Sequence, residues 1–158
     1  MSVAGTVRFS APCFGALRRL VECCSTCRRW SRRRAAARVT QRCTLTGGSF
    51  FDSVPDGGDA YLLKTIIHDW KEDSALAILR NVRTAIAPDG KLLLLEMVLP
   101  EGAPAHPGML LDLEMLLSAG GRKRTAREYA DLLSCTGFRQ TRVIPSASPL
   151  SIVEAVPV

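Results

Sequence analysis

Hydrophobic and polar positions form regular patterns only from about residue 44 onward. Residues 59–67 are a mostly apolar run, which predicts a buried strand. Residues 72–86 carry one apolar helical face, made of Ala75, Ile78, Leu79, Val82 and Ile86. The tripeptide PDG at 88–90 predicts the end of that helix. The apolar run at 91–99 then predicts a second strand, covered on both faces as in a parallel sheet.

Two capping-box patterns mark predicted helix starts. Asp69 is followed three residues later by Glu72, which predicts that Asp69 caps the helix over 72–86. Thr125 is followed at the same spacing by Glu128, which predicts a helix over 125–137.

The remaining C-terminal segments complete the predicted order of elements. Residues 108–121 predict another helix, which ends in glycines. The segments 138–146 and 150–158 predict two strands that form a hairpin at a sheet edge. Strand, helix, strand, helix, helix, strand, strand is an α/β order.

Residues 1–42 differ from the rest in pattern and in charge. Residues 1–46 contain ten arginines and a single acid, Glu22, whereas residues 47–158 contain eleven basic and fourteen acidic residues. The two parts therefore carry formal charges of +9 and −3, which add up to the +6 of the whole chain. The basic character belongs entirely to the N-terminal third, where no sustained hydrophobic period appears.

Three interpretations of residues 1–42 remain open. A basic arm for nucleic acid would explain the arginines, but only Trp30 could stack on a base and no known reader motif is present. A metal site could use Cys24 and Cys27, but no second pair stands at metal spacing, so we expect no metal. We favour the third interpretation, a segment that does not fold and that stems from a shifted reading frame.

Cysteine content and hydropathy bear on the cellular location of the protein. Five of the six cysteines lie before residue 44, but the N-terminus has no uninterrupted apolar stretch of the kind that directs secretion. No apolar run approaches the ~20 residues of a membrane span. We therefore expect a cytoplasmic protein with reduced thiols and no membrane partner.

Two polar side chains stand where the predicted strands end. His68 follows the first strand directly, and Glu96 lies late in the second. Ligands of open α/β sheets bind beyond the carboxyl ends of the strands. If the strands are parallel neighbours, about 4.8 Å apart, the two side chains can meet there as a base oriented by a carboxylate. The alternatives are a helix-terminal histidine without chemistry and an edge carboxylate that reaches solvent.

Several enzyme classes have no signal in the sequence. There is no Gly-x-Ser-x-Gly elbow, no phosphate-binding loop and no HExxH helix. Hydrolase, kinase and zinc-protease functions are therefore not predicted.

Longer motifs resemble a known family. The stretch GGSFFDSVPDGGDAYLLKTIIHDW at 47–70, the LEMVLP at 95–100 and the GGRKRT at 120–125 resemble S-adenosylmethionine-dependent O-methyltransferases. The resemblance is to the bacterial small-molecule branch, which is related to plant caffeate and flavonoid methyltransferases, and it covers about residues 41–158. It implies the C-terminal part of a Rossmann-like methyltransferase sheet, with the first strands and the glycine-rich loop absent.

The resemblance also implies roles for individual residues. His68 would be the general base that takes the proton from the hydroxyl of a small acceptor molecule, Glu96 would hold its imidazole, and Asp69 would be an acidic neighbour of the base. The residues implied at the adenosine end of the cofactor S-adenosylmethionine are Ser49, Phe50 and Lys64.

The sequence departs from the family pattern at several places. Ser49 replaces an aspartate that usually binds the adenine amino group, and Lys123 replaces a carboxylate near the base. Members of the family are homodimers, but their dimerisation domain has no counterpart here, nor has the acid that binds the ribose. We therefore expect residues 43–158 to be a partial catalytic domain. The alternative is an inactive remnant whose basic arm binds nucleic acid or acidic surfaces nonspecifically.

Overall fold

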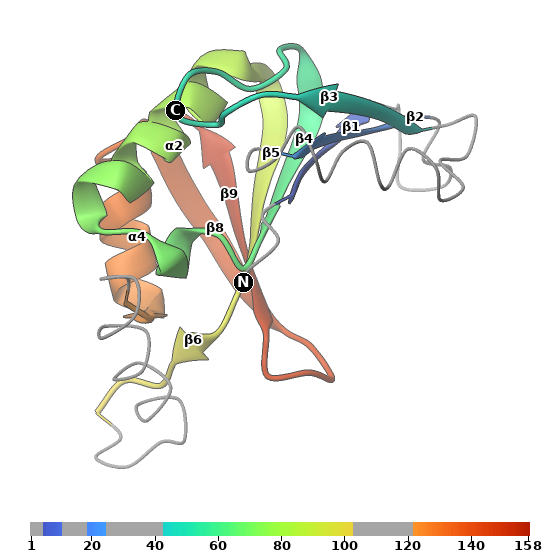
Figure 1. The fold of residues 1–158 in the computed structure, drawn as a ribbon. Helices are drawn as coiled ribbons and strands as arrows, with labels where there is room; N and C mark the ends of the chain where they lie inside the picture. The colour runs from blue at the N-terminus through green and yellow to red at the C-terminus, as the bar shows by residue number, and fades with distance from the viewer. Residues whose placement is uncertain (1–4, 11–18, 25–42, 103–121) are drawn as a thin grey trace.

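A seven-stranded mixed sheet forms the centre of the molecule, with the strand order β3-β2-β1-β4-β5-β9-β8 (Figure 1). The computed structural model describes residues 5–10, 19–24, 43–102 and 122–158. The strands of this sheet are β1 (Gly5–Ser10), β2 (Arg19–Cys24), β3 (Cys43–Gly47), β4 (Gly58–Lys64), β5 (Ile86–Glu96), β8 (Phe138–Pro145) and β9 (Ser151–Pro157). A second sheet pairs β6 (Val98–Leu99) in parallel with β7 (Arg124–Thr125).

The pairing of the later strands matches the sequence prediction. β4 and β5 are parallel neighbours, and β5 continues the sheet through an antiparallel contact with β9. β8 pairs antiparallel with β9 and forms the edge, which confirms the predicted C-terminal hairpin. The predicted α/β class with a Rossmann-like sheet is confirmed.

Three strands on the other side of β4 come from the N-terminal part of the chain. β1 pairs antiparallel with both β4 and β2, and β2 pairs in parallel with β3. We did not predict β1, β2 or β3, because no sustained hydrophobic period runs through the N-terminal part of the chain. The rest of residues 1–42 lies outside the described residues, so the domain boundary at residue 43 stays a prediction.

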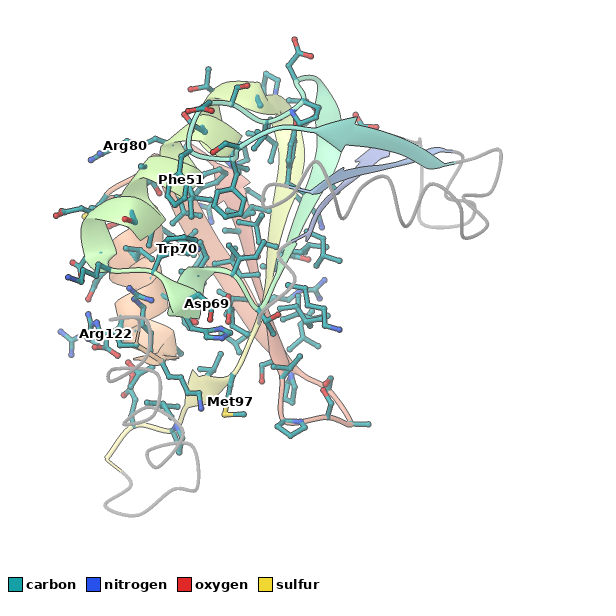
Figure 2. The ribbon with its side chains drawn as sticks, viewed as in Figure 1. Phe51, Asp69, Trp70, Arg80, Met97 and Arg122 are labelled. Atoms are coloured by element: carbon teal, nitrogen blue, oxygen red, sulfur yellow. The ribbon has the colours of Figure 1, made fainter. Side chains whose placement is uncertain are left out.

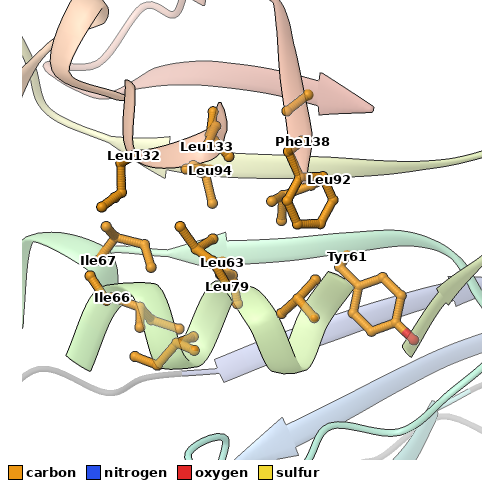
Figure 3. Packing of buried hydrophobic residues seen from close by; sticks show 14 of the residues in the cluster. Tyr61, Leu63, Ile66, Ile67, Leu79, Leu92, Leu94, Leu132, Leu133 and Phe138 are labelled. Atoms are coloured by element: carbon orange, nitrogen blue, oxygen red, sulfur yellow. The ribbon is translucent and has the colours of Figure 1, made fainter. Parts of the chain in front are cut away.

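Two helices, α2 (Glu72–Ala85) and α4 (Ala126–Ser134), cover one face of the sheet (Figure 1). Four residues of the predicted helical face are buried on α2, namely Ala75, Ile78, Leu79 and Val82, whereas Ile86 of that prediction lies in β5. α4 adds Tyr129, Leu132 and Leu133, and Figure 3 shows part of this packing. The strands supply buried residues that lie two apart, such as Leu92 and Leu94. Burial of each large apolar side chain contributes roughly 1.5–3 kcal/mol. Packing on the sheet therefore stabilises these helices more than their intrinsic propensity does.

The two predicted capping boxes have different outcomes. Thr125 caps α4 as predicted: its side chain accepts from the Glu128 backbone N–H, and the Glu128 side chain accepts from the Thr125 N–H. The prediction for Asp69 is wrong, because α2 starts later, with Lys71 as an N-cap that makes no side-chain bond. Asp69 ends the 3-10 turn η1 (Ile67–Asp69).

Other predicted boundaries shift by a few residues. β4 ends at Lys64 rather than at 67, and β5 begins at Ile86, directly after α2 and before the tripeptide at 88–90. An irregularity in the β4–β5 register falls between Gly58 and Ala60, opposite that tripeptide. The predicted helix over 108–121 lies outside the described residues. Among the helices of the described ranges, none is long and apolar enough to cross a membrane.

Candidate active site

A tight turn at the carboxyl end of β4 builds the site. Thr65 has a φ of +52°, a left-handed conformation that is rare for a β-branched residue and costs on the order of 1–3 kcal/mol. The Thr65 N–H still donates to the Leu95 carbonyl of β5. The following N–H groups of Ile66 and Ile67 then both donate to Oε1 of Glu96, at 3.1 and 2.8 Å. The strained turn thus wraps two donors around one carboxylate.

Glu96 is fully buried at the last position of β5. An ionised carboxylate in such a place needs hydrogen-bond donors to offset its lost hydration. Its Oε1 has the two backbone donors, and its Oε2 lies 2.5 Å from Nδ1 of His68. The predicted meeting of His68 and Glu96 across two parallel strands is therefore present, and the alternative of a solvent-reaching Glu96 is excluded.

The second nitrogen of the His68 ring also has an acidic partner. Nε2 lies 3.1 Å from Oδ1 of Asp69. Burial by itself lowers the pKa of His68, but the hydrogen bonds to Asp69 and Glu96 and the charges of both carboxylates raise it to about 9. His68 is therefore an imidazolium at neutral pH, and it can accept a proton only after it has lost this one.

An aromatic cluster lies beside the base. Phe50, Phe51 and Trp70 contact one another edge to face, with ring centroids 4.8–6.1 Å apart. Figure 2 shows Phe51 next to Trp70, with Asp69 close by. Asn81 of α2 fixes the segment that carries the two phenylalanines, because its amide donates to both of their carbonyls at 2.8 Å. The cluster thus joins the loop after β3 to the turn that holds His68.

The other residues implied by the resemblance lie around this centre. The Ser49 Oγ accepts from the N–H of Phe51 at 3.2 Å, so it shapes the loop that presents the phenylalanines. Lys64 is exposed at the carboxyl end of β4. Lys123 is buried directly before β7.

Sequence reasoning missed two buried polar residues near Glu96. Arg124 is only 1% exposed, and its Nη1 donates at 3.2 Å to the carbonyls of Ile67 and Arg122. Tyr129 of α4 is also buried, and its pKa is raised well above the usual value by that burial and by the charge of Glu96. No pattern signals the burial of Arg124, because arginines between helices and strands are normally solvated.

The described residues contain no group of three metal-ligating side chains. Cys24 ends β2, and Cys27 lies outside the described residues.

A buried carboxylate that orients an imidazole at the ends of parallel strands suits several acid–base reactions. The comparison that decides between them is with a family model described as an O-methyltransferase domain, which matches residues 29–139. The chain belongs to the O-methyltransferase family. The match begins before residue 43 and includes β3 and every element up to the start of β8.

Individual relatives agree with this assignment. The phenazine O-methyltransferase PhzM of Lysobacter antibioticus is 48% identical over 127 residues, which are 80% of this chain and 37% of that protein. The crystal structure of LaPhzM has a TM-score of 0.75 at 48% identity and covers 81% of this chain and 39% of that chain. This O-methyltransferase chain therefore spans little more than a third of the length of its relatives.

A third relative was solved with its ligands. It is the O-methyltransferase NcsB1 from neocarzinostatin biosynthesis, in complex with S-adenosylmethionine and 2-hydroxy-5-methyl naphthoic acid. Its TM-score is 0.70 at 35% identity, and the match covers 80% of this chain and 37% of that one.

Proposed function

We propose that this site serves the transfer of a methyl group from S-adenosylmethionine to a hydroxyl group of a small aromatic molecule, with His68 as the general base. The observation that carries the proposal is the His68–Glu96 pair, held by the Thr65 turn at the carboxyl ends of β4 and β5. The named activities of the relatives and the aromatic hydroxy acid bound by NcsB1 support the same chemistry.

The raised basicity of His68 suits a phenolic acceptor. A phenol has a pKa of ~10, and an ordinary histidine has one of ~6.5, so proton transfer between them is uphill by roughly 5 kcal/mol. The hydrogen bond and the charge of Glu96 raise the pKa of His68 and so narrow that difference. The acceptor oxygen attacks the methyl carbon, the carbon–sulfur bond breaks, and the phenolic proton passes to the imidazole. Glu96 stabilises the imidazolium that results.

The same basicity has a cost at neutral pH. His68 must first lose its proton, and Oδ1 of Asp69 now faces the Nε2 atom that an acceptor hydroxyl would approach. We infer that Asp69 moves away from Nε2 when the acceptor binds, which exposes the nitrogen and lowers its pKa at that moment.

The aromatic cluster fits the adenosine end of the cofactor. S-adenosylmethionine supplies a methyl group on a positively charged sulfur and carries a flat purine that packs well against aromatic rings. Phe50 and Phe51 offer such rings, in contact with Trp70, which follows His68 by two residues. The Ser49 hydroxyl can donate to an adenine ring nitrogen, whereas an aspartate at this position could only accept. Exposed Lys64 would complete this end of the site.

A chimera tests the proposal. Residues 43–158 would replace the matching C-terminal part of the Lysobacter phenazine O-methyltransferase, and transfer of a labelled methyl group to that enzyme's own phenazine acceptor would be measured. We expect turnover within about a hundredfold of the intact relative, because the grafted part brings a base, its orienting carboxylate and the aromatic cluster. A folded chimera that binds S-adenosylmethionine but transfers no methyl group would contradict the proposal.

A further inference from the structure

Arg124 is the most completely buried charge that the mechanism above leaves unused. Its Nη1 has two carbonyl acceptors, whereas its Nε and Nη2 are buried without a hydrogen-bond partner among the described residues. An arginine held in this way is costly, because its charge loses hydration and its remaining donors gain at most a weak interaction with the Tyr129 hydroxyl, whose pKa Arg124 lowers. Packing alone would be served better by an apolar side chain of similar size. The burial of this guanidinium therefore indicates an electrostatic role for Arg124.

Glu96 is a buried opposite charge close to Arg124, and both groups contact the same residue of the turn. Glu96 accepts from the backbone nitrogen of Ile67 at 2.8 Å, and Arg124 donates to the backbone oxygen of Ile67 at 3.2 Å. The nitrogen and oxygen of one residue are less than about 4 Å apart, so the two charged groups are no more than roughly 10 Å apart. Tyr129 feels both of them, since the charge of Glu96 raises its pKa and that of Arg124 lowers it.

The charge balance of this cluster changes when the base works. With His68 protonated, Glu96 has an imidazolium at 2.5 Å as its countercharge. With His68 neutral, as it must be to accept a proton, the hydrogen bonds of the fully buried Glu96 to described residues come only from uncharged donors. We propose that Arg124 is a positioning residue of this site: it holds the turn that carries His68 and supplies a buried positive charge that offsets the carboxylate of Glu96 when His68 is neutral. This inference rests on the proposed role of His68 as the base.

The sign of the effect follows from the groups that face His68. Asp69 and Glu96 favour the imidazolium, whereas Arg124 opposes it by repulsion and by competing for Glu96. Tyr129 of α4 is neutral at ordinary pH, and Lys123 is a second buried cation beside Arg124. Arg124 acts on His68 through Glu96, the carboxylate that binds Nδ1 of the imidazole. Removal of the Arg124 charge should therefore raise the pKa of His68.

The chain allows a direct measurement, because it contains only two histidines, His68 and His106. In the His106→Gln background, one imidazole signal remains, and its pKa can be read by NMR titration without any catalysis. Arg124→Gln keeps a hydrogen-bond donor and removes the charge, and we expect it to raise the pKa of His68 measurably above that of the parent. Arg124→Lys, which keeps the charge, should leave it within about half a unit of the parent.

Two controls separate Arg124 from its neighbours. Arg122→Gln removes an arginine that is 44% exposed and is paired with Glu72 and Glu128, so the pKa of His68 should stay the same. The change in the pKa of His68 in Lys123→Gln gives the contribution of the adjacent lysine. An unchanged pKa in a folded Arg124→Gln variant would overturn the proposal, whether or not His68 is later shown to act in methyl transfer.

A rescue experiment covers the case in which Arg124→Gln does not fold. If Arg124 is the countercharge of Glu96, the double variant Glu96→Gln with Arg124→Gln removes both charges and should recover a cooperative unfolding transition. A double variant that also fails to fold would contradict the pairing of these two charges.

Discussion

His68 has a carboxylate at each ring nitrogen, and the two carboxylates have opposite consequences for catalysis. Glu96 is buried and bound by two backbone donors, so it stays in place and orients the ring through Nδ1. Asp69 is partly exposed and lies at Nε2, where it stabilises the protonated form that cannot act as a base. At the scale of residues, the proposed mechanism therefore implies that Asp69 holds the site in a resting state.

The substitution Asp69→Asn tests this view in the chimera. The amide removes one of the charges that raise the pKa of His68, so that pKa should fall from about 9 toward its ordinary value. The rising limb of kcat/KM should then move to lower pH, measured from pH 6 to 10. Asp73→Asn, at an exposed position of α2, serves as the control and should not move it. A limb that stays at the same pH in Asp69→Asn would show that Asp69 does not control the base.

At the scale of elements, the predictable parts were those whose pattern is local. Helical spacing predicted α2 and its buried face, and the capping box predicted the start of α4 at Thr125. The expectation that the two strands are parallel neighbours also predicted that His68 and Glu96 meet, and β4 and β5 are such a pair.

The elements that were not predicted depend on contacts between distant segments. β1 and β2 have no hydrophobic period and join the sheet only through pairing with β4 and β3. Asp69 fails as an N-cap because the Thr65 turn directs the chain toward Glu96, thirty-one residues further along the sequence, before α2 begins. The burial of Arg124 likewise follows from where β7 packs and not from its neighbours in sequence.

The capping box of α4 offers a stability test at this scale. Thr125→Ala removes the side-chain acceptor for the Glu128 N–H and should lower the free energy of unfolding by about 1 kcal/mol. Thr84→Ala is the matched control, since Thr84 is an exposed residue in the last turn of α2 and its change should stay within about 0.5 kcal/mol. Both changes in the free energy of unfolding would be measured by urea denaturation. Equal, small effects of the two substitutions would show that the box does not hold the helix.

At the scale of the whole molecule, the chain carries the proposed base but not every group that the cofactor of the family needs. It spans 37% of the Lysobacter relative, and its 158 residues contain neither the glycine-rich loop nor the ribose-binding acid of the family pattern. Those groups normally let the backbone approach the cofactor and bind its hydroxyls. The aromatic cluster can pack against a purine but cannot replace these hydrogen bonds.

We therefore expect the 158-residue chain to bind S-adenosylmethionine poorly. Each lost hydrogen bond is worth about 0.5–1.5 kcal/mol, so several together lower the affinity by orders of magnitude relative to the chimera. Titration calorimetry of both proteins measures the difference. Micromolar binding by the 158-residue chain would refute this expectation, and salt-sensitive DNA binding without cofactor binding would favour the inactive remnant with a basic arm.

The most direct test of the central claim compares His68→Ala with the parent chimera in one pair of measurements, turnover and cofactor affinity. Loss of a positioned general base should reduce kcat for the phenolic acceptor by about a hundredfold or more. The Kd for S-adenosylmethionine should stay within about a factor of three, because His68 faces the acceptor in this account. Full turnover in His68→Ala would remove His68 from the mechanism and contradict the proposed function of the site.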